Sequence, residues 1–428
     1  MKLLIKGGTL ISPDQKKMFI TDVLVADGKI AAFGDNLEMD GAVIIDAGGK
    51  LVLPGLIDLH VHLREPGFED SETIATGTMA AARGGFTSLA CMPNTNPVAD
   101  NSTVISFILN KARREGKVNV FPIGAITAGS KGEELAEMAY LKEAGAVAFS
   151  DDGRCVSNAA VMYRAMQYAA MINMPVIAHC EDTRLSAQGA MHEGYYSTLL
   201  GLKGIPAAAE EVMVARDLIL AKETGCRLHI AHVSTAGSVQ LIRQAKSNGL
   251  KVTAEATPHH FTLTDRAVTG FDTSTKVNPP LRTIEDVNAV RQGLRDGTID
   301  VIATDHAPHA QEKKEVEYDN APFGISGLET AAGLVWTELV NAGILSPLEA
   351  VEKMTASPAR ILNIAKGILA EGADADLTII DPAQAEKVDP ARFVSKGRNT
   401  PFAGRTLTGV PVMTIVGGKI VFEYTGHE

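Results

Sequence analysis

The sequence predicts an α/β fold: a (β/α)8 TIM-like barrel with a small β-sandwich domain built from both chain ends. Three observations support it. Short apolar strands alternate with amphipathic helical stretches through the middle of the chain, both ends consist of short strands, and 428 residues suffice for a barrel plus a smaller domain. The predicted units are 1–53 for the first half of the sandwich, 54–365 for the barrel and 366–428 for the second half.

The composition is that of an ordinary globular protein, with 45% hydrophobic and 21% charged residues. No apolar run reaches the roughly 18 residues of a membrane span, and the first residues do not resemble a signal peptide. A formal net charge of −11 argues against non-specific nucleic-acid binding. The four cysteines are widely spaced, which fits a reducing compartment. We therefore expect a cytoplasmic protein with neither a membrane nor a nucleic-acid partner.

Both flanks of the chain are rich in short strands bounded by glycine, proline and aspartate turns. The strands expected there are 2–7, 18–26, 29–33 and 43–46 at one end, and 375–380, 410–416 and 419–422 at the other. Neither flank is large enough to bury a core alone. We therefore expect the two flanks to pack together as one sandwich, with the middle of the chain inserted between them.

Eight apolar strands are expected in the middle of the chain, and helical patterns separate most of them. The strands are 52–62, 87–92, 118–123, 146–150, 176–179, 227–232, 251–256 and 301–304; the clearest helices are 71–82, 156–171, 207–224 and 238–247. Eight such units imply a closed parallel barrel, and functional residues of such barrels lie at the carboxyl ends of the strands.

Two histidines one residue apart end the first expected barrel strand. Side chains of a strand alternate between its faces, so His60 and His62 point the same way, about 7 Å apart along the backbone. Two imidazoles so placed can converge on one metal ion. Arg64 lies two residues further on the same face, which places an anion-binding group beside two metal ligands.

Five of the eight expected strands end in histidine or aspartate. These residues are His60 and His62, Asp151 and Asp152, His179, His229 and His232, and Asp305 with His306 and His309. Four histidines and two aspartates are more than a single tetrahedral zinc with an open position needs. They suit two zinc ions about 3.5–4 Å apart that share a carboxylate.

Strand alternation limits these ligands without selecting all of them. Asp151 and Asp152 should face opposite sides, so only one can bridge two metals, and alternation does not decide which. His229 and His232 are three residues apart and should also oppose each other. We therefore expect His229 to pack outside the barrel, against the helices.

Two segments carry a resemblance to a known family. They read Asp-Leu-His-Val-His-Leu-Arg-Glu-Pro at 58–66 and Ala-Thr-Asp-His-Ala-Pro-His-Ala-Gln-Glu-Lys at 303–313. Both look like signature segments of dihydroorotases, in the amidohydrolase superfamily. Met-Pro-Asn-Thr at 92–95 and Asn-Ala-Pro-Phe-Gly at 320–324 are similar to the type I branch. The resemblance covers essentially the whole chain.

The resemblance implies a two-zinc centre in each subunit. Its ligands would be His60, His62 and Asp305 for one Zn²⁺, His179 and His232 for the other, with Asp152 and a hydroxide bridging the two. Asp305 would also act as the catalytic base and then the acid. Related hydantoinases and allantoinases use a carboxylated lysine from the fourth strand, whereas this chain has Ser-Asp-Asp-Gly at 150–153.

The activity that the resemblance implies is the reversible hydrolysis of the cyclic amide of (S)-dihydroorotate to N-carbamoyl-L-aspartate, the third step of pyrimidine (UMP) biosynthesis. The substrate-binding residues would be His62, Arg64, Asn94, Asn278, His309, Phe323 and Gly324. Arg64 offers a two-pronged match to the substrate carboxylate. Arg64 could instead form a structural salt bridge, and Asn278, which precedes a proline, could be a turn residue.

Two other functions remain open on the sequence. One keeps the metal site and changes the substrate to a hydantoin, a dihydropyrimidine or allantoin. The other is a non-catalytic protein that binds an enzyme such as aspartate transcarbamoylase. Homologues suggest a homodimer, and association with aspartate transcarbamoylase is a further expectation. The charged stretch 310–320 is either a solvated loop or a mobile flap over the substrate.

Overall fold

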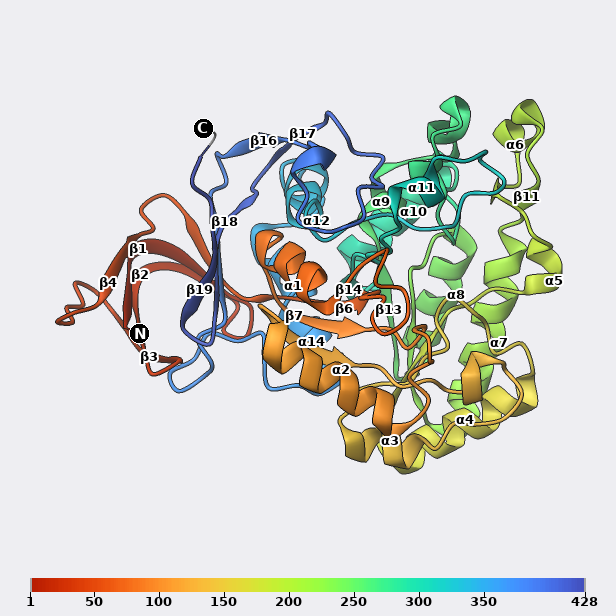
Figure 1. Cartoon of the computed structure of the whole chain (residues 1–428), viewed down its shortest axis with the longest axis horizontal. Coiled ribbons are helices and arrows are strands. Elements are labelled where there is room, and N and C mark those ends of the chain that lie inside the picture. The colour runs from red at the N-terminus through yellow and green to blue at the C-terminus, as the bar shows by residue number, and fades with distance from the viewer. Residues whose placement is uncertain (1, 427–428) are drawn as a thin grey trace.

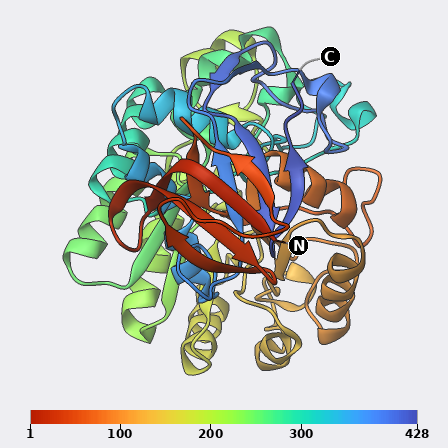
Figure 2. The same cartoon turned by 90° about the vertical axis from the view of Figure 1, so that its left-hand side faces the viewer.

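The computed structural model describes residues 2–426 and divides into a strand-built part and a barrel (Figure 1). The terminal sheet lies on the left in Figure 1, and the barrel with its ring of helices lies on the right. Seen from that side, the sheet covers the centre of the barrel (Figure 2). The predicted fold class is confirmed. Among the described residues, no helix combines the length and apolar character that crossing a membrane requires.

Strands from both ends of the chain form one eight-stranded sheet. They are β1 (Leu3–Ser12), β2 (Lys17–Ala26), β3 (Lys29–Gly34), β4 (Val43–Asp46), β5 (Leu51–Pro54), β15 (Leu377–Ile380), β18 (Pro411–Val416) and β19 (Lys419–Glu423). Their order is β19-β18-β15-β5-β1-β2-β3, with β4 beside β1. The antiparallel pairing of β15 with β5 joins the two flanks. Apolar side chains from both flanks, Leu3 and Ile415 among them, share one buried core.

Seven regular strands and one irregular segment make the barrel. The strands are β6 (Leu56–Val61), β7 (Phe86–Cys91), β8 (Asn119–Pro122), β9 (Pro175–Ala178), β12 (Arg227–Ile230), β13 (Val252–Ala256) and β14 (Val301–Ile302). In place of the expected strand at 146–150, single bridges join Phe149 to Gly124 and to Val176. A bridge between Val61 and His306 closes the barrel.

Helices surround the barrel, and most of the long ones begin at a residue suited to capping. The longer helices are α1 (Ile74–Arg83), α2 (Ser102–Glu115), α4 (Ala159–Met171), α7 (Ala208–Thr224), α8 (Ala236–Ser247) and α10 (Ile284–Asp296). Side chains of Thr73, Asn101, Asn158, Thr235 and Thr283 accept backbone N–H groups in the first turns of five of these helices. In these five helices, the capping residue fixes the position at which the helix begins.

Shorter elements complete the connections. They are α3 (Met138–Ala144), α5 (Thr183–Ser186), α6 (Tyr195–Leu200), α9 (Pro258–Thr262), α11 (Gln311–Lys314), α12 (Ala331–Val335), α13 (Pro347–Lys353), α14 (Ala356–Leu362), β10 (Met191–His192), β11 (Gly204–Ile205), β16 (Ala385–Lys387) and β17 (Thr406–Thr408). The short 3₁₀ segments are η1 (Ala128–Ser130), η2 (Asp265–Gly270), η3 (Thr273–Thr275) and η5 (Pro390–Arg392), and η4 (Trp336–Val340) is a π-helical segment.

The prediction of one continuous strand over 52–62 is wrong, because the chain changes sheets at Gly55. Residues on one side of Gly55 belong to β5 in the terminal sheet, and those on the other belong to β6 in the barrel. The crossing is crowded: a Cβ on Gly55 would lie 2.1 Å from Thr87 Oγ1. The unit boundaries at 53/54 and 365/366 remain a proposal.

Gly55→Ala should therefore destabilise the protein. Overpacking of this kind costs about 1–3 kcal/mol, because the buried Thr87 side chain must shift. Thermal unfolding should show a lower Tm. Gly270→Ala is the matched control, since no atom lies within 4 Å of the Cβ that it would add. Equal Tm values for the two variants would contradict this account of the crossing.

Candidate metal centre and substrate pocket

The six side chains expected to bind metal gather at the carboxyl ends of the barrel staves. They are His60 and His62 from β6 and the residue just after it, Asp152 after the irregular fourth stave, His179 after β9, His232 after β12 and Asp305 after β14. All six are buried. Five separate staves therefore contribute to one cluster, as the barrel geometry requires.

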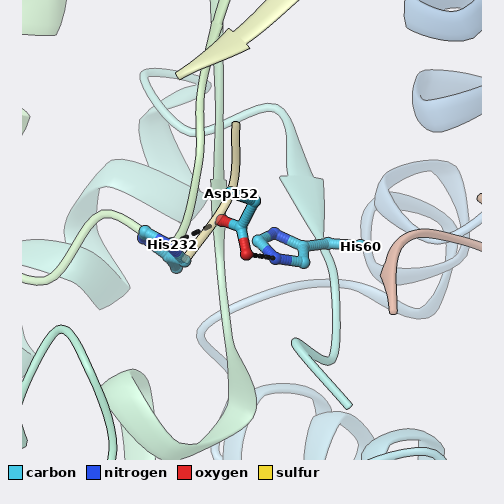
Figure 3. A group of neighbouring side chains, drawn as sticks. All are labelled: His60, Asp152 and His232. Carbon is cyan, nitrogen blue, oxygen red and sulfur yellow. Dashed lines mark ion pairs between the residues drawn. The ribbon is translucent and has the colours of Figure 1, made fainter. Parts of the chain in front are cut away.

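Asp152 lies at the centre of this cluster, between His60 and His232 (Figure 3). Its Oδ2 is 3.4 Å from Nε2 of both His60 and His62. Its Oδ1 is 3.4 Å from His232 Nε2 and 3.5 Å from His179 Nδ1. Each oxygen of one carboxylate thus faces a different pair of imidazoles, which is the arrangement of a bridging ligand.

The neighbouring Asp151 points away from the cluster. Its Oδ1 accepts hydrogen bonds from the backbone N–H groups of Ile126 and Thr127, at 2.8 and 3.1 Å. Its Oδ2 accepts a hydrogen bond from the Thr127 hydroxyl. Asp151 therefore fixes the loop after β8. Of the two aspartates, only Asp152 faces the imidazoles, and its role as a bridging ligand remains a proposal.

Asp305 completes the half of the cluster that contains His60 and His62. Its Oδ1 lies 3.1 Å from His62 Nε2 and 3.4 Å from His60 Nε2. In the other half, His179 Nδ1 and His232 Nε2 are 2.9 Å apart. The cluster therefore has two halves, with Asp152 between them.

The donor set fits divalent cations. His60 Nε2 and Asp152 Oδ1 are buried and have no hydrogen-bond partner within the described chain. Buried polar atoms without partners are costly, and a cation between them removes that cost. Imidazole nitrogens and carboxylate oxygens are zinc ligands. Burial alone would raise the pKa of Asp152, but the imidazoles, His60 foremost, hold it well below its usual range, so this ligand is ionised.

Three residues hold the ligands from behind. Glu255 Oε1 accepts from His60 Nδ1 at 2.5 Å, and Asn94 Oδ1 lies 2.8 Å from His62 Nδ1. Glu181 Oε2 lies 3.3 Å from His179 Nε2. The two glutamates were not predicted from the sequence. Glu181 had a usable signal, because it lies two residues beyond His179 at the same strand end.

The prediction that His229 packs outside the barrel is wrong. His229 pairs in register with Ile177, which belongs to the apolar core inside the barrel. Its Nε2 donates to Glu255 Oε2 at 3.0 Å. The expectation failed because β12 ends at Ile230, so strand alternation no longer governs the direction of His232.

Three residues of the site have left-handed backbones that side chains other than glycine rarely adopt. The φ angles are +62° at Arg64, +33° at His232 and +47° at Asp305. Such conformations cost about 1–3 kcal/mol each and are concentrated at functional sites. In this protein they set the directions of the Arg64, His232 and Asp305 side chains just beyond the ends of three barrel strands.

A cavity of about 350 Å³ opens beside this cluster of imidazoles and carboxylates. Its lining includes all seven expected substrate-binding residues: His62, Arg64, Asn94, Asn278, His309, Phe323 and Gly324. Gly324 is required by the packing, because a Cβ there would lie 2.6 Å from the Ala307 carbonyl oxygen. Asn278 donates to Glu181 at 2.9 Å, so it is more than a turn residue.

Arg64 supplies a positive charge to this cavity. Its Nε donates to the Pro308 carbonyl at 3.2 Å, and it forms no ion pair with a carboxylate of residues 2–426. Burial lowers its pKa to about 10, which leaves it charged at neutral pH. Burial and the nearby Arg64 lower the pKa of His309 to about 3, so His309 is neutral and donates to the Phe323 carbonyl at 2.8 Å. The structural salt bridge considered for Arg64 is therefore not formed in this structure.

The charged stretch 310–320 contains α11 and is held by buried amines. Lys314 Nζ donates to the carbonyls of Pro322 and Thr273, at 2.7 and 3.0 Å. Lys276 Nζ donates to the Tyr318 carbonyl at 2.8 Å. The stretch lies in sequence between His309 and Phe323, which both line the cavity. Its movement over a substrate stays a prediction.

Comparisons with known proteins agree with this geometry. A family model described as "Dihydro-orotase-like" matches residues 49–238, and one described as "Amidohydrolase family" matches residues 191–422. A protein of Pelotomaculum thermopropionicum named "Dihydroorotase" is 70% identical over 99% of each chain. A protein of Syntrophus aciditrophicus with the same name is 55% identical over 99% of this chain and 100% of its own.

Solved structures share the whole fold. The L-hydantoinase (dihydropyrimidinase) of Arthrobacter aurescens has a TM-score of 0.89 and 30% identity, covering 100% of this chain and 97% of its own. The D-hydantoinase of a Thermus species has a TM-score of 0.85 and 26% identity, covering 99% and 97%. With relatives at 55–70% identity over nearly their full length, the chain belongs to the dihydroorotase family of the amidohydrolase superfamily.

Proposed function

We propose that this chain is a dihydroorotase that hydrolyses the cyclic amide of (S)-dihydroorotate reversibly to N-carbamoyl-L-aspartate, the third step of de novo UMP biosynthesis. One observation carries the proposal: a single cavity is lined by three imidazoles and both carboxylates of the cluster, His62, His179, His232, Asp152 and Asp305, and also by the charged Arg64. The substrate has matching parts, an amide to be hydrolysed and a carboxylate to be bound.

The proposed cofactor is a pair of Zn²⁺ ions. One would be held by His60, His62 and Asp305, the other by His179 and His232, with Asp152 shared. Two observations support this division. The two oxygens of Asp152 face different imidazoles, and its buried Oδ1 has no hydrogen-bond partner among the described residues. When bound, zinc lowers the pKa of coordinated water from about 15.7 toward 7 and polarises the amide carbonyl.

Asp305 is the proposed acid–base residue. Its carboxylate lies at the boundary between the metal cluster and the cavity. It takes a proton from the attacking water and returns that proton to the leaving amide nitrogen. Burial would raise its pKa, but His60 and the other imidazoles lower it below the usual range, so Asp305 is ionised, which is the form that can accept a proton.

Arg64 is the proposed carboxylate-binding residue, with Asn94, Asn278 and His309 beside it. A guanidinium without a carboxylate partner gains charge-assisted hydrogen bonds when an anion arrives. The backbone at Phe323 and Gly324 would contact the polar edge of the ring. These groups orient the amide toward the metal cluster and Asp305, which fixes which ring bond is attacked.

The hydantoinase-type alternative has the structural neighbours in its favour, since those proteins share the fold. Against it, the fourth stave has no lysine at 150–153, and hydantoins lack the carboxylate that Arg64 suits. The non-catalytic alternative has no specific observation in its favour, because all six ligand positions are filled by residues able to bind metal. A homodimer, association with aspartate transcarbamoylase and a cytoplasmic location remain proposals.

The direct test is steady-state hydrolysis of L-dihydroorotate by protein of measured metal content, with hydantoin and allantoin as parallel substrates. We expect turnover of dihydroorotate that disappears on chelation and returns with Zn²⁺. Preferential turnover of hydantoin or allantoin would move the assignment to the hydantoinase type. A zinc-loaded protein that hydrolyses none of the three would favour the non-catalytic alternative.

Arg64→Ala should lower kcat/KM for dihydroorotate. A hydrogen bond to a charged group contributes about 1.5–3 kcal/mol, which corresponds to roughly 10- to 150-fold. Initial-rate measurements check it, with Arg114→Ala as a control, because the Arg114 side chain on α2 is 75% exposed. Undiminished kcat/KM in Arg64→Ala would speak against recognition of a substrate carboxylate.

Asp152→Asn and Asp151→Asn should have different effects. Asp152→Asn removes the shared charge and should lower the zinc content of purified protein together with its activity. Asp151→Asn should keep its zinc but lose about 1–3 kcal/mol of stability, because its acceptor atoms hold the loop at Ile126 and Thr127. Elemental analysis and thermal unfolding measure both effects, and the reverse pattern would contradict the assignment of Asp152.

A further inference from the structure

Glu255 is a fully buried carboxylate on β13, inside the barrel and behind the metal cluster. Its register partner on β14 is Val301, which belongs to the apolar core inside the barrel. A carboxylate in such surroundings is costly unless its oxygens accept hydrogen bonds. Both of its oxygens do so, and the donors belong to β6 and to the region of β12.

The first donor fixes a ligand of one half of the cluster. His60 Nδ1 lies 2.5 Å from Glu255 Oε1, and an ionised carboxylate can only accept. When His60 is neutral, as a metal ligand must be, its proton is therefore on Nδ1. This leaves Nε2, which is 3.4 Å from an oxygen of Asp152 and of Asp305, free to bind a cation.

The second donor fixes a ligand of the other half. The backbone N–H of His232 donates to the same oxygen, Glu255 Oε1, at 3.1 Å. His232 has a left-handed backbone with φ of +33°, a conformation that its surroundings must hold in place. His60 and His232 lie on opposite sides of Asp152 (Figure 3), so one oxygen behind the cluster holds a ligand on each side.

His229 holds Glu255 in this position. Its Nε2 donates to Glu255 Oε2 at 3.0 Å, and its Nδ1 lies 2.8 Å from the Thr253 hydroxyl. All three side chains lie on the adjacent strands β12 and β13. Regular strands are more precise supports than loops, which suits a group that aligns ligands.

We propose that Glu255 is a positioning residue shared by both metal positions, with His229 as its support. This inference rests on the two-metal site of the proposed function. Glu255 orients His60 for one metal through its ring, and His232 for the other through its backbone. Carboxylates that hold metal-binding histidines typically change metal affinity 10- to 100-fold when they are substituted.

The test measures zinc affinity at both positions of the whole protein by competition with a chromophoric chelator, together with the absorption spectrum of the cobalt-substituted form. Glu255→Gln should bind zinc about 10- to 100-fold more weakly at both positions and show an altered cobalt spectrum. His229→Gln should change the same quantities in the same direction, by less. It keeps the inference testable if Glu255→Gln does not fold.

Asp376→Asn is the matched control. Asp376 is also a buried carboxylate with several donors, Lys366 Nζ and the Gly417 N–H among them, but it lies beside β15 of the terminal sheet. The Asp376→Asn variant should be less stable than the unsubstituted protein but should keep its zinc affinity and its cobalt spectrum. This separates ligand alignment from the general effect of losing a buried charge.

The outcomes distinguish a failure of the shared role of Glu255 from a failure of the two-metal proposal. If the unsubstituted protein binds fewer than two metal ions, the two-metal proposal itself fails. If it binds two, unchanged affinity in folded Glu255→Gln, or weakening at one position alone, overturns the shared role. The shared role would also be overturned if Asp376→Asn weakened zinc binding as much as Glu255→Gln does.

Discussion

The site depends on the hydrogen bonds that join the first barrel strand, β6, to the segment that follows the last one, β14. Asp58, fully buried on β6, accepts hydrogen bonds from the backbone N–H of its neighbour His60 and from that of Thr304, 246 residues away. The His62 N–H donates to the His306 carbonyl at 2.8 Å. These bonds bring Asp305 beside the two histidines of the first stave. Without these bonds between the first and last barrel strands, the ligands proposed for one metal, His60, His62 and Asp305, would belong to two unconnected segments.

Much of this arrangement could be predicted from sequence, because two local rules apply to it. Alternation along a strand puts His60 and His62 on one side, and parallel staves present their carboxyl ends together. The rules fail where strands stop being regular. At Gly55 the chain leaves one sheet for another, and beyond Ile230 the backbone turns, so His229 and His232 do not oppose each other. The role of Glu255 was not predicted, because nothing in the sequence around this glutamate shows that it is buried.

Charge is distributed unevenly in relation to the proposed substrate. The protein carries a formal net charge of −11, so its overall field repels an anion. The attraction must be local, and Arg64 provides it at short range where solvent is scarce. His309 stays neutral beside it, so among the side chains that line the cavity Arg64 carries the positive charge that faces a ligand.

The sheet that joins both flanks has a consequence for biosynthesis. β5 emerges early from the ribosome, yet its neighbour β15 begins at Leu377 and β19 ends at Glu423. All six side chains proposed to bind metal are translated before that neighbour exists. Until then β5 has an open edge and the apolar face around Val52 lacks its cover. The nascent chain must therefore keep its first strands from aggregating until the last ones arrive, and assembly of this layer is necessarily a late event.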